Sequence, residues 1–171
     1  PDITCFGKVI GGGLPIGAIG GSRAVMENLT PIGKVFHAGT LAGNPLATAA
    51  GLAALNELTQ DVYMELGARA RALSTLLRDA CLSAGIVAQF PVVGTLVGAF
   101  FGPNTPTNFD EAKQTDEKMY ARFFHAMLAE GVALAPGAYE ALFVGLGHTD
   151  SVMQQLAERA QRAAHAAVLA Q

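Results

Sequence analysis

The chain has 171 residues, of which 51% are hydrophobic and 15% are charged, and its net charge is −3 at pH 7. This composition excludes a disordered chain, because it supplies enough apolar side chains to bury a core in one or two small domains. The negative charge provides no basic field for a nucleic-acid backbone or an anionic membrane surface. The remaining expectation is a small-molecule partner.

Membrane and metal chemistry are also not predicted. Apolar runs are interrupted well short of the ~20 residues that cross a bilayer, and no charged segment with a cleavage site opens the chain, so we expect a cytoplasmic protein. The two cysteines, Cys5 and Cys81, lack metal-ligand or redox spacing, and we expect both to be buried thiols. The four histidines are too far apart to form an obvious ligand pair.

The first sixty residues are rich in small side chains. Residues 1–6 are apolar and β-branched and predict a strand, and residues 16–21 predict a second short one after a Gly-rich turn at 11–15. Ser22 is a candidate N-cap for a short helix through Leu29. The next helix has stronger signals, since a good N-cap and a proline at the first helical position precede an Ala- and Leu-rich run: Asn44, Pro45 and residues 46–58.

The remainder alternates helices and strand pairs. A long helix over residues 61–84 carries Leu and Ala at helical spacing and ends at Gly85. Strands are predicted over 86–93 and 95–101, joined through Gly94. After a loop at 102–108 we expect a helix capped by Thr115 or Asp116, strands over 132–135 and 142–146, and a last helix from Asp150.

This order predicts an α/β to α+β protein with two parts. Residues 1–60 would form the end of one domain, with a Lys-bearing strand, a Gly-rich turn and a helix. Residues 61–171 would form an α+β domain, in which the long helix bridges the two parts.

Lys8 is the first candidate for chemistry, because three glycines follow shortly after it in Phe6-Gly7-Lys8-Val9-Ile10-Gly11-Gly12-Gly13. A lysine that attacks a carbonyl carbon needs a partly desolvated place that lowers its pKa, and close approach of a ligand needs neighbours without side chains. Val9, Ile10 and the glycines would supply both. The residues alone leave open an ordinary exposed lysine beside a flexible turn.

A second candidate is the loop Phe36-His37-Ala38-Gly39-Thr40-Leu41-Ala42-Gly43, which runs directly into the helix capped by Asn44. Free backbone N–H groups at a helix start, together with the Thr40 hydroxyl, can bind a phosphate without a basic side chain. A plain helix-capping loop is the alternative. No Walker loop or dinucleotide fingerprint occurs here, which excludes those two nucleotide readings.

Taken together, the lysine motif and the HAGTLAGNP loop resemble the fold-type I, subgroup III aminotransferases, whose lysine binds pyridoxal 5'-phosphate covalently. The resemblance covers essentially the whole chain. It implies that Lys8 is the catalytic, cofactor-binding lysine and that Gly39 and Thr40 bind the cofactor phosphate. In that family the threonine serves the partner subunit's cofactor, so a homodimer is implied.

Within the subgroup, several segments resemble the glutamate-1-semialdehyde aminomutases: Ala18-Ile19-Gly20-Gly21, Ala38-Gly39-Thr40-Leu41, Arg122-Phe123-Phe124-His125 and Leu134-Ala135-Pro136-Gly137-Ala138-Tyr139-Glu140-Ala141. The resemblance implies intramolecular amino transfer that forms 5-aminolevulinate for tetrapyrrole synthesis, with a pyridoxamine 5'-phosphate form in the cycle. It makes Glu140 a substrate-binding residue. Tyr139 and Phe143 are expected to be core aromatics.

The chain departs from the family pattern at four positions, with Ala42 and Gly137 where Ser is usual, His37 where Gln is frequent and Leu142 where Gly is common. These departures leave open a related ω-type class III aminotransferase. A non-catalytic assembly module is the other alternative. The resemblance also implies that further cofactor-binding residues lie upstream of Pro1, so we expect this chain alone to be inactive.

Overall fold

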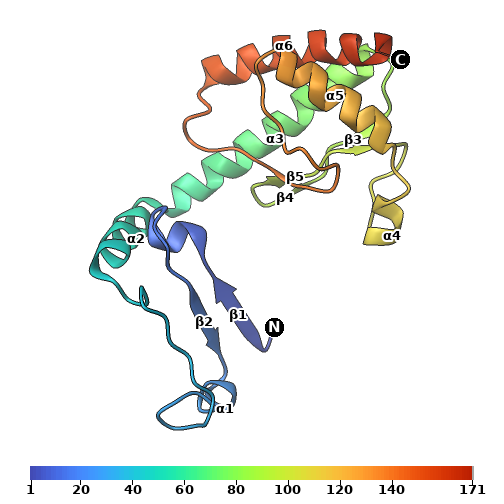
Figure 1. The fold of residues 1–171 in the computed structure, drawn as a ribbon. Coiled ribbons are helices and arrows are strands. Elements are labelled where there is room, and N and C mark those ends of the chain that lie inside the picture. The colour runs from blue at the N-terminus through green and yellow to red at the C-terminus, as the bar shows by residue number, and fades with distance from the viewer. Residues whose placement is uncertain (171) are drawn as a thin grey trace. The chain divides into compact units, whose positions relative to one another are not determined.

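The computed structural model describes residues 1–170 and is a mixture of helices and short strands, as predicted (Figure 1). The chain divides into two compact units, Pro1–Val62 and Tyr63–Gln171. Each unit has its own packing and is described by itself. The predicted boundary between domains at residues 60–61 concerns the whole protein and stays a prediction.

The first unit is built around an antiparallel hairpin. Strand β1 (Ile3–Phe6) pairs with β2 (Ala18–Gly21), with Ile3 opposite Gly21 and Phe6 opposite Ala18. A single turn of 3-10 helix, η1 (Lys8–Gly11), follows β1 directly, so the chain leaves the strand before Lys8. Both predicted strands are therefore present, and the predicted Gly-rich turn is partly helical.

Helix α2 (Pro45–Glu57) begins as the sequence predicts. The Asn44 Oδ1 accepts a hydrogen bond of 2.9 Å from the Ala47 N–H, and Pro45 occupies the first helical position. Ser22 stands at the N-cap of α1 (Arg23–Met26), as predicted, but its side chain makes no capping hydrogen bond, and the helix is a single turn that ends before Leu29. Without a capping hydrogen bond or a buried apolar face, so short a segment cannot extend its helix.

The long helix α3 (Gln60–Ser83) begins in the last residues of the first unit and belongs mostly to the second, and its bounds agree to within one residue with the predicted 61–84. A bent hairpin follows, formed by β3 (Ala88–Gln89) with β6 (Phe100–Phe101) and by β4 (Val92–Val93) with β5 (Leu96–Val97). The two strand pairs continue one another in the same pairing register, and between them the Gly98 N–H donates to the Pro91 carbonyl. Gly94, at φ +61°, provides the left-handed residue that the two-residue turn requires.

One predicted strand is absent. Residues 132–135 form no ladder, and the only described partner strand of β7 (Leu142–Phe143) is β5. The reason is local, since the Val132 N–H donates to the Met127 carbonyl and so continues the end of helix α5 (Glu117–Ala129). Segment 132–135 is thereby held against helix α5, and β7 pairs with the open edge of β5.

The unit also contains α4 (Phe109–Ala112), which the sequence analysis missed, and the last helix α6 (Asp150–Leu169), which begins where it was predicted. Helices α5 and α6 run side by side in Figure 1. Small side chains on one face of α6 permit this close approach, because they recur at the helical spacing of three and four residues. These fully buried residues are Ala160, Ala163, Ala164 and Ala167.

The core of the second unit lies between its long helices and the hairpin. Phe101 stacks edge-on against Tyr120, with ring centroids 5.8 Å apart, and also contacts the fully buried Phe123. Cys81 is buried there as predicted, and burial raises the pKa of its thiol to about 12. Helix α3 and the hairpin contribute further buried residues to this core: Ala70, Leu73, Leu77, Ala80, Val97 and Ala99.

Three burial predictions were wrong. Cys5 is exposed on β1, whose residues are all exposed. Tyr139 and Phe143 are 39% and 67% exposed, so neither is a core aromatic. Phe143 is exposed because the side chains of a strand alternate, and its neighbour Leu142 takes the buried side of β7.

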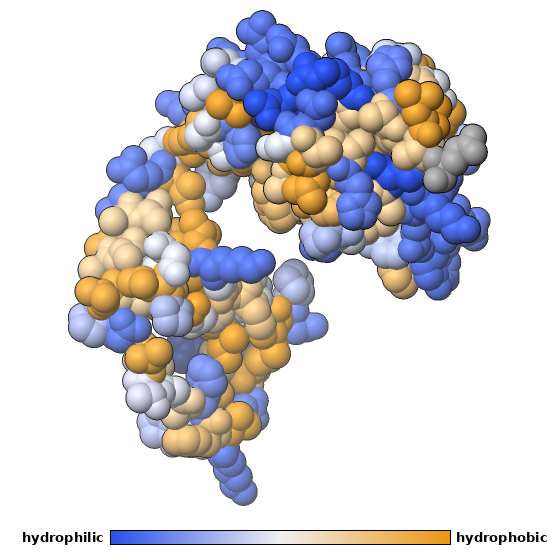
Figure 2. All heavy atoms as spheres, turned by 45° about the horizontal axis from the view of Figure 1, so that its top comes forward, coloured by the Kyte–Doolittle hydropathy of each residue, from blue (hydrophilic) through white to orange (hydrophobic). Residues whose placement is uncertain are grey.

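Apolar side chains are widely exposed in the first unit. Figure 2 shows hydrophobic surface over it, and Phe36 and Leu46 are 79% and 71% exposed. Exposed apolar surface of this kind is typical of an interface. Among residues 1–170, no helix is both long enough and apolar enough to span a membrane.

Candidate active site

Lys8 is held in an unusual backbone conformation. Its φ is +56°, and it is the one described residue other than glycine with a positive φ. The left-handed region is sterically unfavourable for a side chain with a Cβ, and such residues cluster at functional sites. The Lys8 side chain is exposed, and its Nζ makes no ion pair or hydrogen bond with residues 1–170.

Space surrounds the Lys8 turn. A Cβ added at Gly7 or at Gly13 would meet no atom within 4 Å. The apolar enclosure expected from Val9 and Ile10 is incomplete, however, since Val9 is 50% exposed and Ile10 is only half-buried. That these neighbours desolvate the amine in the whole protein stays a prediction.

The loop from Phe36 to Gly43 approaches the same hairpin. A hollow of about 400 Å³ lies between them, lined by β1 and β2 residues and by loop residues that include His37 and Gly39. Lys8 and Thr40 do not line this hollow. The structure therefore brings the loop beside the hairpin that leads to Lys8, with Gly39 as the predicted residue that faces it.

Thr40 is the second residue of a tight turn, in which the Ala42 N–H donates to the Gly39 carbonyl at 2.9 Å. The backbone N–H groups of Thr40, Leu41 and Gly43 donate to no group within residues 1–170. Three unsatisfied donors and an exposed hydroxyl just before a helix fit an anion such as a phosphate.

Glu140 belongs to the second unit and closes a turn of its own. Its Oε1 accepts a hydrogen bond of 2.9 Å from the Gly137 N–H, and its backbone N–H donates to the Gly137 carbonyl at 3.2 Å. The side chain is exposed. One carboxylate oxygen is thus used by the turn, and Oε2 has no hydrogen bond to a described residue.

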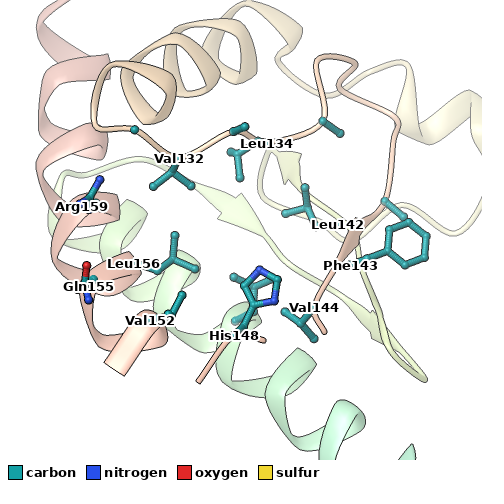
Figure 3. Close-up of a pocket in the computed structure, with 15 residues that line it drawn as sticks. Val132, Leu134, Leu142, Phe143, Val144, His148, Val152, Gln155, Leu156 and Arg159 are labelled. Atoms are coloured by element: carbon teal, nitrogen blue, oxygen red, sulfur yellow. The ribbon is translucent and has the colours of Figure 1, made fainter. Parts of the chain in front are cut away.

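The larger hollow of the second unit lies beside this turn and holds none of the predicted site residues. It has a volume of about 690 Å³, and Figure 3 shows Val132, Leu142 and Leu156 turned toward its interior. Two of its polar side chains are already engaged, because Arg159 donates to the Glu130 carbonyl and the His148 Nδ1 bonds with Gly145. No group of three or more potential metal ligands occurs in residues 1–170.

One pair of residues was missed by the sequence analysis. The Tyr139 hydroxyl donates a hydrogen bond to the Glu117 carboxylate, although 22 positions separate the two residues. The only signal in the sequence was the position of Tyr139 immediately before Glu140. A tyrosine in an apolar segment suggested a core residue, and the partner on α5 could not be deduced from spacing.

The fold and these loops define a class of protein. Residues 1–162 match the family Aminotransferase class-III, and the chain therefore belongs to the class III aminotransferases. A solved β-phenylalanine aminotransferase from Variovorax paradoxus superposes with a TM-score of 0.81 at 30% identity, over 94% of this chain and 37% of that one.

Two curated relatives are more similar in sequence. The glutamate-1-semialdehyde 2,1-aminomutase of Desulfosudis oleivorans is 49% identical over 151 residues, which are 88% of this chain and 35% of the relative. That of Desulforamulus reducens is 46% identical over 168 residues, 98% of this chain and 39% of the relative. The chain thus spans little more than a third of the length of the relatives that it matches.

Proposed function

We propose that the protein to which this chain belongs converts glutamate-1-semialdehyde to 5-aminolevulinate by intramolecular transfer of an amino group, with pyridoxal 5'-phosphate as its cofactor. The observation that carries the proposal is the identity of 46% to 49% with aminomutases over nearly the whole chain. Two solved aminotransferases that superpose on this chain are 26% and 30% identical to it.

Lys8 is the residue that would hold the cofactor covalently. Its Nζ has no competing partner among the described residues, and its left-handed backbone fixes the direction in which the side chain leaves η1. The backbone has open space beside it at Gly7 and at Gly13, which supports the approach of a ligand. When bound, the cofactor supplies the electron sink that makes the substrate carbon acidic. The Lys8 amine would then move the proton between that carbon and a carbon of the cofactor.

Thr40 and Gly39 would bind the cofactor phosphate. The hydroxyl of Thr40 and the three unsatisfied N–H groups of the loop provide hydrogen bonds to an anion at the start of α2. We further propose that the loop serves the cofactor of the partner subunit in a homodimer. The exposed Phe36 and Leu41 beside Thr40 support this, since apolar side chains of this size are usually covered at an interface.

Glu140 would bind the substrate. Its Oε2 is available to a cationic group, either the substrate's amino group or a basic side chain that orients it. Small-molecule substrates and a cytoplasmic location fit this function.

One experiment separates the proposal from its closest alternative. The whole protein in its pyridoxamine 5'-phosphate form receives glutamate-1-semialdehyde without any keto acid, and 5-aminolevulinate is measured. An aminomutase returns the amino group to the same molecule, so many turnovers are expected. A requirement for an added keto acid would identify an ω-type aminotransferase, and the departures at Gly137 and Leu142 would then be the first places to explain the changed specificity.

A further inference from the structure

The turn that carries Glu140 is fastened to the helices before it by the side chain of Tyr139. The Tyr139 hydroxyl donates to a Glu117 carboxylate oxygen on α5, and its ring packs edge-on against Phe109 of α4, with centroids 5.6 Å apart and an interplanar angle of 76°. The Lys113 Nζ lies 5.2 Å from the centre of the Phe109 ring. The exposed Tyr139 is therefore held by two different elements.

The start of the same segment has a separate anchor. The buried Tyr120 donates its hydroxyl to the Ala135 carbonyl, one residue before the turn. Between Ala135 and β7, the side chain of Tyr139 makes the only hydrogen bond from a described side chain of this segment to another element. Glu140 itself bonds only within the turn, to Gly137. The position of its carboxylate thus depends on its neighbour.

We propose that Tyr139 is a positioning residue for Glu140, and that its hydrogen bond to Glu117 and its contact with Phe109 form a latch that fixes the turn over residues 136–141. The functional consequence rests on the proposed role of Glu140 in binding substrate. Within the latch the hydrogen bond is charge-assisted, and the edge-on ring contact adds direction. The pKa of Tyr139 is raised, first because of this hydrogen bond, which agrees with a bound hydroxyl.

The latch is tested first without reference to activity, by hydrogen–deuterium exchange of the whole protein. Tyr139→Phe removes the hydroxyl and keeps the ring, and Glu117→Ala removes the acceptor. Each variant should speed exchange in the peptide over residues 136–141 by about three- to tenfold, which corresponds to one lost hydrogen bond. Glu117→Gln keeps a neutral acceptor and should give a smaller change.

A double-mutant cycle isolates the pair, because Glu117 also lies in the first turn of α5 and contributes there by itself. The variant with both Tyr139→Phe and Glu117→Ala should exchange no faster over residues 136–141 than either single variant. Tyr63→Phe is the matched control, since Tyr63 is half exposed on α3 and has no hydrogen bond to a described residue. It should leave the peptide unchanged.

Kinetics then connect the latch to Glu140. Tyr139→Phe should raise the KM for substrate by about three- to tenfold at nearly constant kcat, in the same sense as Glu140→Gln but less. In a Glu140→Gln background, Tyr139→Phe should leave KM unchanged and still speed exchange.

The outcomes are distinct. Unchanged exchange in Tyr139→Phe, or additive effects in the cycle, would overturn the latch. A second outcome is that Tyr139→Phe speeds exchange without changing KM, while Glu140→Gln does change KM. That result would overturn the positioning role of Tyr139. If neither substitution alters KM while exchange still responds, the latch is supported and the error lies in the proposed function of Glu140.

Discussion

The Cα of Gly51 on helix α2 lies directly against the carbonyl of Ile10 in η1. A Cβ built on Gly51 would be 2.0 Å from the Ile10 oxygen. Gly12, which follows η1, makes a similar approach to helix α2, since a Cβ on Gly12 would lie 2.6 Å from the Ala50 carbonyl oxygen. These contacts hold the turn that begins with Lys8 against the helix that begins after Thr40. The two predicted cofactor residues are thus linked through a packed backbone.

We expect Gly51→Ala to displace η1 and reduce cofactor occupancy. The new methyl group meets a backbone carbonyl that cannot move alone, and overpacking of this kind costs about 1–3 kcal/mol. Cofactor absorbance per protomer and thermal unfolding measure the effect. Gly20→Ala is the matched control, because a Cβ there meets nothing within 4 Å, and it should keep full occupancy. Normal occupancy in Gly51→Ala would argue against a rigid link.

Lys8→Ala should abolish covalent attachment of the cofactor. In the unsubstituted protein, borohydride reduction followed by peptide mapping should place the label on Lys8, because it has an unpaired amine in a fixed backbone. Lys113 is the informative comparison, since its Nζ already pairs with Asp110 at 2.8 Å. A label on Lys113 or on Lys34 would refute the assignment of Lys8.

Thr40→Val should weaken cofactor binding by about 1–3 kcal/mol, the range for a lost hydrogen bond to a charged group. Equilibrium dialysis of the whole protein measures this directly. Valine has nearly the same shape as threonine, so the turn from Gly39 to Ala42 should keep its backbone hydrogen bond. Unchanged affinity would make the loop a helix-capping segment and nothing more.

Mixed dimers test whether Thr40 serves the partner subunit. A dimer of one Lys8→Ala subunit and one Thr40→Val subunit should contain one intact site, because the Lys8 of the second subunit would meet the Thr40 of the first. Combining both substitutions in one subunit, opposite an unsubstituted one, should leave no intact site. The reverse pattern, with an intact site only in the dimer that combines both substitutions in one subunit, would show that Thr40 acts within its own subunit.

Gly137→Ser should move the carboxylate of Glu140. A Cβ at position 137 would lie 2.6 Å from the Glu140 Oε1, and this oxygen is the flexible end of a side chain that can shift. We therefore expect a changed KM for substrate with little loss of stability, below about 1 kcal/mol. Steady-state kinetics and thermal unfolding separate the two effects. An unchanged KM would mean that Glu140 does not need its present position.

Elements with local signals were predictable from the sequence. The Asn44 cap, the helical repeat of α3 and the turn at Gly94 each depend on residues within a few positions of one another, and all three are present. The same logic would have found α4. There the Glu111 N–H donates to the Asn108 Oδ1 and the Asn108 side-chain amide donates to the Glu111 Oε1, each at 2.9 Å, and the two residues have the spacing of a capping box.

Features that depend on distant partners were not predictable. Segment 132–135 has the composition of a strand, but the end of α5 takes its hydrogen bond and β5 pairs elsewhere. The prediction that Tyr139 is buried failed because its partners, Glu117 and Phe109, come from other elements. The roles of Lys8 and Thr40 came from a family resemblance, whereas the positive φ of Lys8 could only be seen in the structure.

The titration of Tyr139 gives a last prediction. The hydrogen bond to Glu117 is the main cause of its raised pKa, and partial desolvation and the charge of Glu117 act in the same direction. Because the folded-state pKa lies above the unfolded value of about 10, the hydrogen bond stabilises the folded protein below that pH and is lost as pH rises through the folded pKa.

The ultraviolet absorbance of tyrosinate, taken as the difference between the unsubstituted protein and Tyr139→Phe, follows this one residue. Glu117→Ala should shift the midpoint down toward the ordinary value, while the burial that raises the pKa of Tyr120 stays in place. A midpoint that is the same with and without Glu117 would mean that the two side chains are not bonded in solution.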